Sequence, residues 1–220
     1  MSTLKVNTIK NSTGTDAVTI AGDGKVTFPV GGTQLAMQKV AASNTAQTNI
    51  TSLVLDLPTT TDFLVLKLYL YGVRHKSNVD NRWAIQLRQQ SNSTYFTSSN
   101  YAGQGMNPYS NNTGTAGESN YLFTSQNHGW LTQSHHPGQA NNAGWDEHAF
   151  EMTIYGTNND TNWTRTTHHT SLEYSNNAHY YMSVGSMALQ NVALIDQLKF
   201  LTTTNSAFDL RSYGLYKIMV

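Results

Sequence analysis

The sequence contains no cysteine among its 220 residues. Disulfides, thiolate metal sites and cysteine nucleophiles are therefore excluded. Charged residues make up only 12% of the chain, against roughly 25% in ordinary soluble domains, and the net charge is zero. Without a basic excess, the chain has no long-range attraction for nucleic acid or for an anionic membrane surface. We therefore expect no nucleic-acid partner and no membrane insertion.

Long hydrophobic runs are missing as well. The longest, Phe63–Leu66, is far too short to cross a membrane. The start, MSTLKVNTIK, lacks the basic and then apolar pattern of a signal peptide. If the protein works outside a cell, we expect it to be released by another route, such as lysis.

Asn, Ser, Thr, Gln and Gly take the place of the missing charges, on a background of short apolar and alternating runs. An uncharged polar surface of this kind suits hydrogen bonding to neutral partners such as glycans. Short strand patterns bounded by Asn, Ser and Gly clusters predict an all-β sandwich or barrel. The patterns run over Leu53–Leu57, Asp62–Tyr71, Trp83–Arg88, Phe150–Ile154, Tyr180–Val184, Val192–Leu201 and Tyr216–Val220. The nearly continuous apolar character of Asp62–Tyr71 predicts a strand buried on both faces.

Two segments have a different composition. Tyr95–Gly144 is long and rich in Asn, Ser, Gly and Gln, yet it carries many aromatic residues, which disordered tracts lack. We expect ordered, elaborated loops there, with a short strand near Tyr121–Thr124. A second such loop is expected over Gly156–Thr170.

The stretch VTIAGDGKVTF, residues 18–28, predicts a small hairpin whose register follows from its alternation. A two-residue turn at Asp23-Gly24 would put the apolar residues of the two strands on opposite faces. A three-residue loop, Gly22-Asp23-Gly24, instead pairs Ile20 with Val26 and Val18 with Phe28 on one apolar face. The second register is favoured, because such loops with a terminal glycine are a common hairpin class.

This hairpin has little of its own to cover its apolar face. Leu4, Val6 and Ile9 add one more amphipathic strand, which makes a unit of about 35 residues, and pieces of this size need oligomerisation or another staple. Gly31-Gly32 is typical of a hinge. We therefore predict an oligomerising segment at residues 1–35, built on Leu4, Val6, Ile9, Val18, Ile20, Val26 and Phe28, followed by a β-sandwich at 36–220.

Both ends of the chain resemble virion structural proteins of marine tailed bacteriophages (cyanophage-like), many of which are labelled tail fibres. The start, MSTLKVNTIKNSTG…AVTIAGDGKVTF, and the end, IDQLKFLTTTNSAFDLRSYGLYKI with Phe208, Leu215 and Tyr216, carry this resemblance. The resemblance implies a homotrimer whose N-terminal strands interlock around a threefold axis, with a jelly-roll-like β-sandwich head. It further implies attachment to the particle at one end and binding to the host surface at the other.

No catalytic motif stands out. Phosphate-binding glycine loops, Gly-x-Ser-x-Gly elbows and His-Glu-x-x-His helices are absent from the sequence. Asp146 and Glu147 are neighbours and point to opposite faces of any strand, which makes them a poor glycosidase pair, and Asp160 and Glu173 stand apart. The doublets His135-His136 and His168-His169 could serve a metal, but polar-loop histidines are the simpler interpretation. We predict no cofactor, no metal and no enzymatic activity.

Aromatic residues in polar segments are candidates for sugar binding, because a sugar ring offers C–H faces and a hydroxyl rim. Trp83 alternates with Ile85 and is expected in the core. The candidates for receptor or glycan binding are Tyr101, Tyr109, Trp130, Trp145 and Trp163. Packing of these rings or a place at a subunit interface is the competing explanation.

Three functional hypotheses remain open. The first is a non-enzymatic, homotrimeric tail fibre that recognises a host-surface glycan or protein and attaches to other virion proteins through its N-terminal segment. The second is a capsid decoration protein or head fibre that stabilises the shell. The third is a polysaccharide depolymerase. All three place the protein in the virion, and copy number per particle separates the first two.

Overall fold

A computed structural model describes residues 8–10, 16–20, 26–27, 37–76, 82–110, 116–132, 148–174 and 179–219. The chain divides into two compact units, Met1–Ala36 and Met37–Val220. We call them the N-terminal unit and the sandwich domain. Among the described residues no helix is long and apolar enough to cross a membrane.

The N-terminal unit is a three-stranded antiparallel meander of β1 (Thr8–Lys10), β2 (Asp16–Ile20) and β3 (Val26–Thr27). Ile20 pairs with Val26, which confirms the register predicted from the alternation. Ile9 pairs with Val18, so the predicted third strand lies beside the hairpin. Leu4, Val6 and Phe28 lie outside the described residues.

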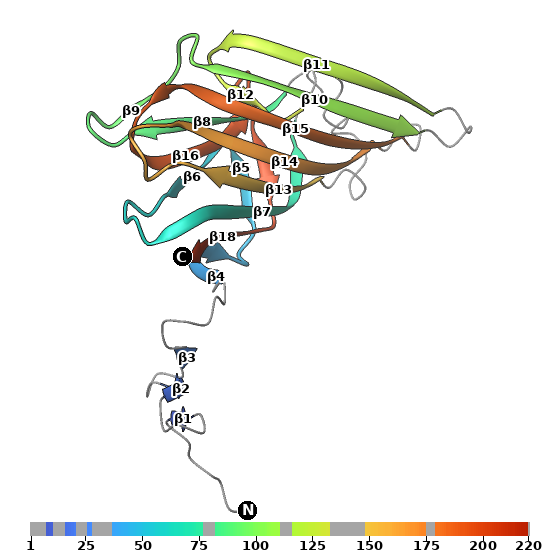
Figure 1. Cartoon of the computed structure of the whole chain (residues 1–220). Coiled ribbons are helices and arrows are strands. Elements are labelled where there is room, and N and C mark those ends of the chain that lie inside the picture. The colour runs from blue at the N-terminus through green and yellow to red at the C-terminus, as the bar shows by residue number, and fades with distance from the viewer. Residues whose placement is uncertain are drawn as a thin grey trace, which may run out of the picture. The chain divides into compact units, whose positions relative to one another are not determined.

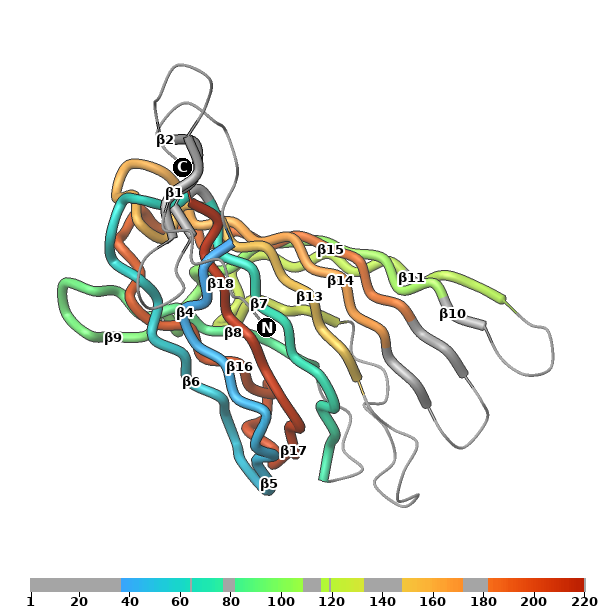
Figure 2. The backbone as a smooth tube through the Cα atoms, turned by 90° about the horizontal axis from the view of Figure 1, so that it is seen from below, coloured from blue at the N-terminus to red at the C-terminus, as the bar shows by residue number. Residues whose placement is uncertain are grey.

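The sandwich domain is all-β and antiparallel, with two sheets that Figure 1 shows packed against each other. The large sheet runs in the order β11-β10-β15-β14-β13-β7, after which β18 and β17 both pair with β7 (Figure 2). β4 pairs with β18, and β5 pairs with β17. The strands of this sheet are β4 (Met37–Ser43), β5 (Gln47–Ile50), β7 (Phe63–His75), β10 (Tyr101–Ser110), β11 (Ala116–Gln126), β13 (His148–Tyr155), β14 (Trp163–Tyr174), β15 (His179–Val192), β17 (Phe208–Leu210) and β18 (Ser212–Met219).

The small sheet has the order β12-β8-β16-β6, and the short β9 pairs with β8. Its strands are β6 (Ser52–Asp56), β8 (Trp83–Gln89), β9 (Thr94–Tyr95), β12 (Gly129–Trp130) and β16 (Ile195–Thr202). Strands β6, β8, β13, β15 and β16 form where the alternation predicted them.

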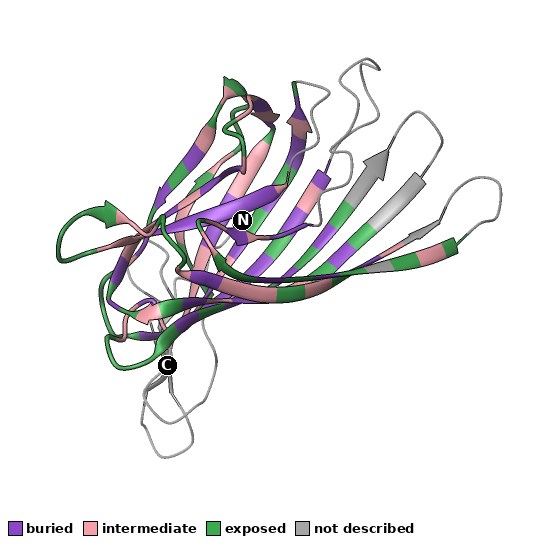
Figure 3. Ribbon diagram, turned by 90° about the horizontal axis from the view of Figure 1, so that it is seen from above, coloured by how far each residue is buried: buried purple, intermediate pink, exposed green. Residues whose placement is uncertain are grey.

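The core lies between the sheets and is filled by residues that alternate along strands such as β6, β7 and β14, as the purple bands in Figure 3 show, whereas β8 is buried at five consecutive positions. Trp83 lies at its centre, 1% exposed, as expected from the sequence. Its ring stacks on Phe200 at 5.2 Å and meets Phe208 and Phe150 edge to face at 5.3 and 5.8 Å. Such contacts add to the burial of the rings and fix how the two sheets pack.

Three predictions about local structure are wrong. β7 is not buried on both faces: Leu66, Leu68 and Leu70 are buried, whereas Tyr69 and Tyr71 are exposed. Tyrosine tolerates this position because its hydroxyl remains in water.

Over its described residues, 95–110 and 116–132, the polar segment after Tyr95 is also mainly strand and not loop. It forms the long β10–β11 hairpin, with ten and eleven residues in its strands. Likewise, the loop expected over Gly156–Thr170 ends at Asn162, because β14 begins at Trp163. Threonines dominate that strand, and their β-branched side chains favour extended backbone.

Candidate functional site

A shallow trough crosses five strands on the outer face of the large sheet, the face turned away from the small sheet. Tyr155 on β13 lies directly opposite Arg165 on β14, and Arg165 lies opposite Ala188 on β15. Ala188 pairs in turn with Ala102 on β10. Because directly opposed residues share a face of the sheet, the long side chains of Tyr155 and Arg165 lie beside the small side chains of Ala188 and Ala102.

The far wall of the trough comes from β11, where Leu122 pairs with Gln104 and is 75% exposed. The trough is open to solvent and has a volume of about 650 Å³, within the range of small-ligand sites. Its lining residues are Ala102, Gly103, Gln104, Leu122, Phe123, Thr124, Tyr155, Arg165, Thr166, Thr167, Ser186, Met187 and Ala188. The trough therefore combines an aromatic face, one guanidinium, several hydroxyl groups and the side-chain amide of Gln104.

A second hollow adjoins the first and shares Gln104, Leu122 and Ser186 with it. This open hollow has a volume of about 540 Å³, and Met106, Asn120 and Val184 extend its lining away from Tyr155 and Arg165. The second hollow therefore lacks Tyr155 and Arg165, and it places Met106, Leu122 and Val184 beside Gln104, Asn120 and Ser186.

The inner side of the same strands carries a buried polar cluster. The Tyr121 hydroxyl lies 2.9 Å from Nε2 of His168 and 3.4 Å from the Ser183 hydroxyl, which donates to the Leu131 carbonyl oxygen at 2.9 Å. Burial lowers the pKa of His168 to about 4 and raises that of Tyr121 to about 12. His168 is 3% exposed and Ser183 is fully buried, so this serine and histidine are closed to any substrate and act as internal hydrogen-bond partners.

Glycines make room for the aromatic rings on this inner side. A methyl group on Gly105 would come within 2.4 Å of the Tyr121 ring, and one on Gly103 within 2.7 Å of Phe123. Tyr121 and Phe123 can therefore lie flat across β10 only because these positions have no side chain. The glycines of this hairpin thus serve packing, whereas composition alone suggested loops.

A second buried cluster surrounds Trp83. The His75 ring centroid is 4.2 Å from that of Trp83, and the His148 centroid is 6.0 Å away. No ring nitrogen of either histidine has a hydrogen-bond partner among the described residues. Burial lowers the pKa of His75 to about 4 and that of His148 to about 3, the latter with help from repulsion by His75.

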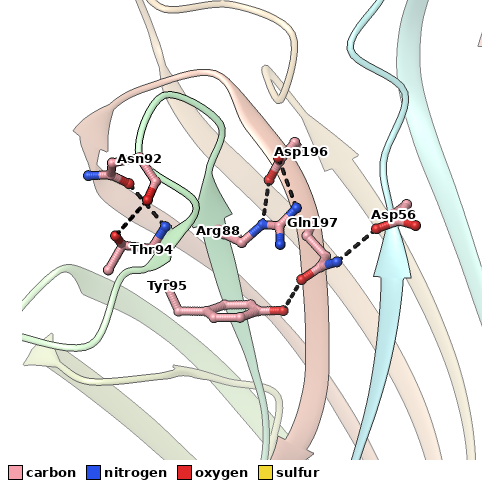
Figure 4. Close-up of polar contacts among 7 residues, drawn as sticks. All are labelled: Asp56, Arg88, Asn92, Thr94, Tyr95, Asp196 and Gln197. Carbon is pink, nitrogen blue, oxygen red and sulfur yellow. Dashed lines mark hydrogen bonds and ion pairs between the residues drawn. The ribbon is translucent and has the colours of Figure 1, made fainter.

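The outer face of the small sheet carries a polar network that Figure 4 shows in close-up. Arg88 donates through Nε and a terminal nitrogen to the two carboxylate oxygens of Asp196, at 2.9 and 3.0 Å. Gln197 donates to Asp56 at 2.7 Å and accepts from the Tyr95 hydroxyl. Because these groups bond to one another across β6, β8, β9 and β16, they hold the small sheet together and offer little to a ligand.

The structure separates the five aromatic candidates. Tyr101 is fully buried, and its hydroxyl accepts from the Leu87 backbone N–H at 2.7 Å, so its assignment to ligand binding is wrong. Trp130 is half-buried beneath Arg82, whose guanidinium carbon lies 3.7 Å from the ring centroid. Trp163 is 45% exposed at the start of β14, two residues before Arg165.

The remaining candidate positions are described less fully. Tyr109 has a backbone place in β10, and Trp145, Asp146 and Glu147 lie outside the described residues. Tyr155 and Arg165 line the trough but were not predicted. Their opposite placement across β13 and β14 depends on a register that the sequence does not reveal.

The histidine doublet at residues 168 and 169 is split by the sheet. His168 faces the interior and His169 is exposed on the outer face, as alternation on a strand requires. Within the described part of the chain, no three His, Asp or Glu side chains gather as metal ligands do. Asp160 lies exposed in the turn before β14.

The fold is a two-sheet antiparallel β-sandwich with an open trough on the outer face of its large sheet. No family model and no curated protein matches the chain. Among solved structures, a protein of unknown function from Bacteroides ovatus has 8% identity and a TM-score of 0.19, over 68% of this chain and 45% of its own. A legume lectin-like domain from Entamoeba histolytica has 8% identity and a TM-score of 0.18, over 83% of this chain and 89% of its own. These likenesses are too distant to contribute to the argument about function.

Proposed function

We propose that the protein is a homotrimeric bacteriophage tail fibre whose sandwich domain binds a host-surface glycan in the trough between Tyr155 and Leu122. The observation that carries this proposal is the composition of the trough. Its ring, small apolar floor and hydroxyl and amide groups match the C–H faces and hydroxyl rim of a sugar. Trp163, exposed on the same strand as Arg165, is placed to extend the contact.

The N-terminal unit supplies assembly and attachment in this proposal. Its three short strands, of three, five and two residues, make too little structure to be stable alone. Copies from other chains would complete it. The resemblance of both chain ends to phage virion proteins favours three copies and a place in the particle.

Glycan binding can be tested with the purified full chain on an array of bacterial surface polysaccharides. Tyr155→Ala should weaken binding by about tenfold or more, as loss of a central aromatic contact does. Tyr71→Ala is the matched control, because Tyr71 is equally an exposed tyrosine of the large sheet but does not line the trough. Equal loss in both variants, or no binding by the parent protein to any polysaccharide, would contradict the proposal.

Assembly is tested separately by light scattering. We expect a mass near three times 24.3 kDa for the full chain. Removal of residues 1–36 should reduce the mass to that of a single sandwich domain. A full chain with the mass of one copy would overturn the trimer.

A further inference from the structure

Four apolar side chains are exposed on the outer face of three adjacent strands, β10, β11 and β15. Met106 is 50% exposed, Leu122 75%, Met182 41% and Val184 40%. Met106 lies directly opposite Val184, so these positions share one face of the sheet. We call the four residues the apolar patch. Contiguous exposed apolar residues mark an interaction surface, whereas scattered ones need no explanation.

At the patch, the usual placement of polar side chains outside and apolar side chains inside is reversed. Ser183, between Met182 and Val184 on β15, is fully buried. On the inner side its backbone N–H donates to the Thr170 hydroxyl at 3.2 Å, and its hydroxyl donates to the Leu131 carbonyl oxygen at 2.9 Å. A strand with water on its outer face would carry the serine outside and the methionine and valine inside. The alternation on β15 is therefore what a strand with a partner on its outer face requires.

Charge is nearly absent from the same strands. β10 and β15 contain no Lys, Arg, Asp or Glu, and β11 contains only Glu118. Such a surface has no electrostatic complementarity to an acidic or basic partner. It meets a second copy of itself without like-charge repulsion, and depletion of charge with enrichment of Met is typical of interface cores.

The unpaired edge of β11 also indicates an interface. β11 is the end strand of the large sheet, and no described strand pairs with its far side. Edge strands of monomeric proteins are protected by charges, prolines or short length. β11 has eleven residues, one charge and no proline.

We propose that the apolar patch and the neighbouring edge of β11 pack against a second copy of this chain. The contact would border the trough, since Leu122 belongs to both. A neighbouring copy would thereby cover the second hollow, which adjoins the trough, and the glycan site of one copy would lie beside its neighbour.

The size of the patch determines how strong this contact can be. Three neighbouring strands of about ten residues span about 500 Å² of sheet, from strand rise and spacing. Even this whole area, of which the apolar patch is a part, is below the roughly 800 Å² per partner of a standard stable interface. The contact is therefore weak by itself. It rests on the proposed N-terminal assembly for its occupancy, because tethered copies experience millimolar effective concentrations.

Photo-cross-linking of the full chain tests the proposal. The absence of native cysteine means that Leu122→Cys places one benzophenone-maleimide label at the patch. Val54→Cys is the matched control, since Val54 is 44% exposed on the small sheet. We expect irradiation to join chains at position 122 and not at position 54. Adding Val184→Glu should reduce the yield at position 122 several-fold, while Val54→Glu leaves it unchanged.

The outcomes separate this inference from the proposed trimer. A trimeric mass without cross-linking at position 122 would overturn the patch contact and leave the trimer standing. Cross-linking with the mass of a dimer would support the contact and overturn the trimer. Cross-linking at position 122 to a different virion protein in intact particles, with none between copies, would also overturn the contact.

Discussion

We expect the sandwich domain to lose stability between pH 8 and pH 5, because three of its histidines are buried in their neutral form. Burial lowers the pKa of His75 and His168 to about 4 and that of His148 to about 3, from 6.5 in the unfolded chain. Below pH 6.5 the unfolded chain takes up protons that the folded chain does not accept. The stabilisation is therefore complete above pH 6.5, falls as the pH decreases, and levels off below pH 3 to 4.

The magnitude follows from the width of this window. At pH 5 the unfolded histidines are 1.5 pH units below their pKa of 6.5, and each unit corresponds to about 1.36 kcal/mol. Each buried histidine thus lowers the free energy of unfolding at pH 5 by about 2 kcal/mol, and the three together lower it by about 6 kcal/mol. This equals a large fraction of the 5–15 kcal/mol that typical domains possess.

Urea unfolding followed by tryptophan fluorescence, at fixed protein concentration and several pH values, measures this free energy. His75→Leu should reduce the pH-dependent loss by about one third and cost little at pH 8, since it removes two buried nitrogens without partners. His169→Gln is the control, because His169 is exposed beside His168. A free energy of unfolding that changes by less than about 1 kcal/mol between pH 8 and pH 5 would refute the reasoning.

Three further substitutions probe the packing. Tyr101→Phe should cost about 1–3 kcal/mol, because it leaves the buried Leu87 N–H without an acceptor, and glycan binding should be unaffected. Gly103→Ala should lower the melting temperature, because its methyl would lie 2.4 Å from the Ser186 carbonyl oxygen; an unchanged melting temperature would contradict the close approach. Leu198→Ala should cost about 2–5 kcal/mol in chemical denaturation, since Leu198 is fully buried in the core; a cost below about 1 kcal/mol would contradict that placement.

The sequence predicted the all-β class and many strands because alternation reports directly on which residues face a core. The sequence was least informative where apolar side chains face outward and a polar side chain faces the core. The methionine and valine of β15 lie outside and the serine between them inside, and no local pattern indicates that reversal.

The trough could not be predicted for a related reason. Tyr155 and Arg165 are ten residues apart in sequence and meet only because the β13–β14 register places them opposite each other. Conversely, Tyr101 has the composition of a binding loop around it but lies in the core, because Gly103 and Gly105 allow the hairpin to form there. Local composition therefore indicates how polar a segment is, whereas the pairing of its strands decides which side chains are exposed.

The pairing of β4 with β18 has a practical consequence. Met37 at the start of the sandwich domain pairs with Ile218 near its end, so the two ends of the domain are neighbours in one ladder. A short linker could join them, and new termini could be opened in an exposed turn such as residues 91–93. The domain is thus suited to circular permutation. A reporter fused after β18 would lie beside residue 37, at the end of the large sheet that is farthest from β11 in the strand order.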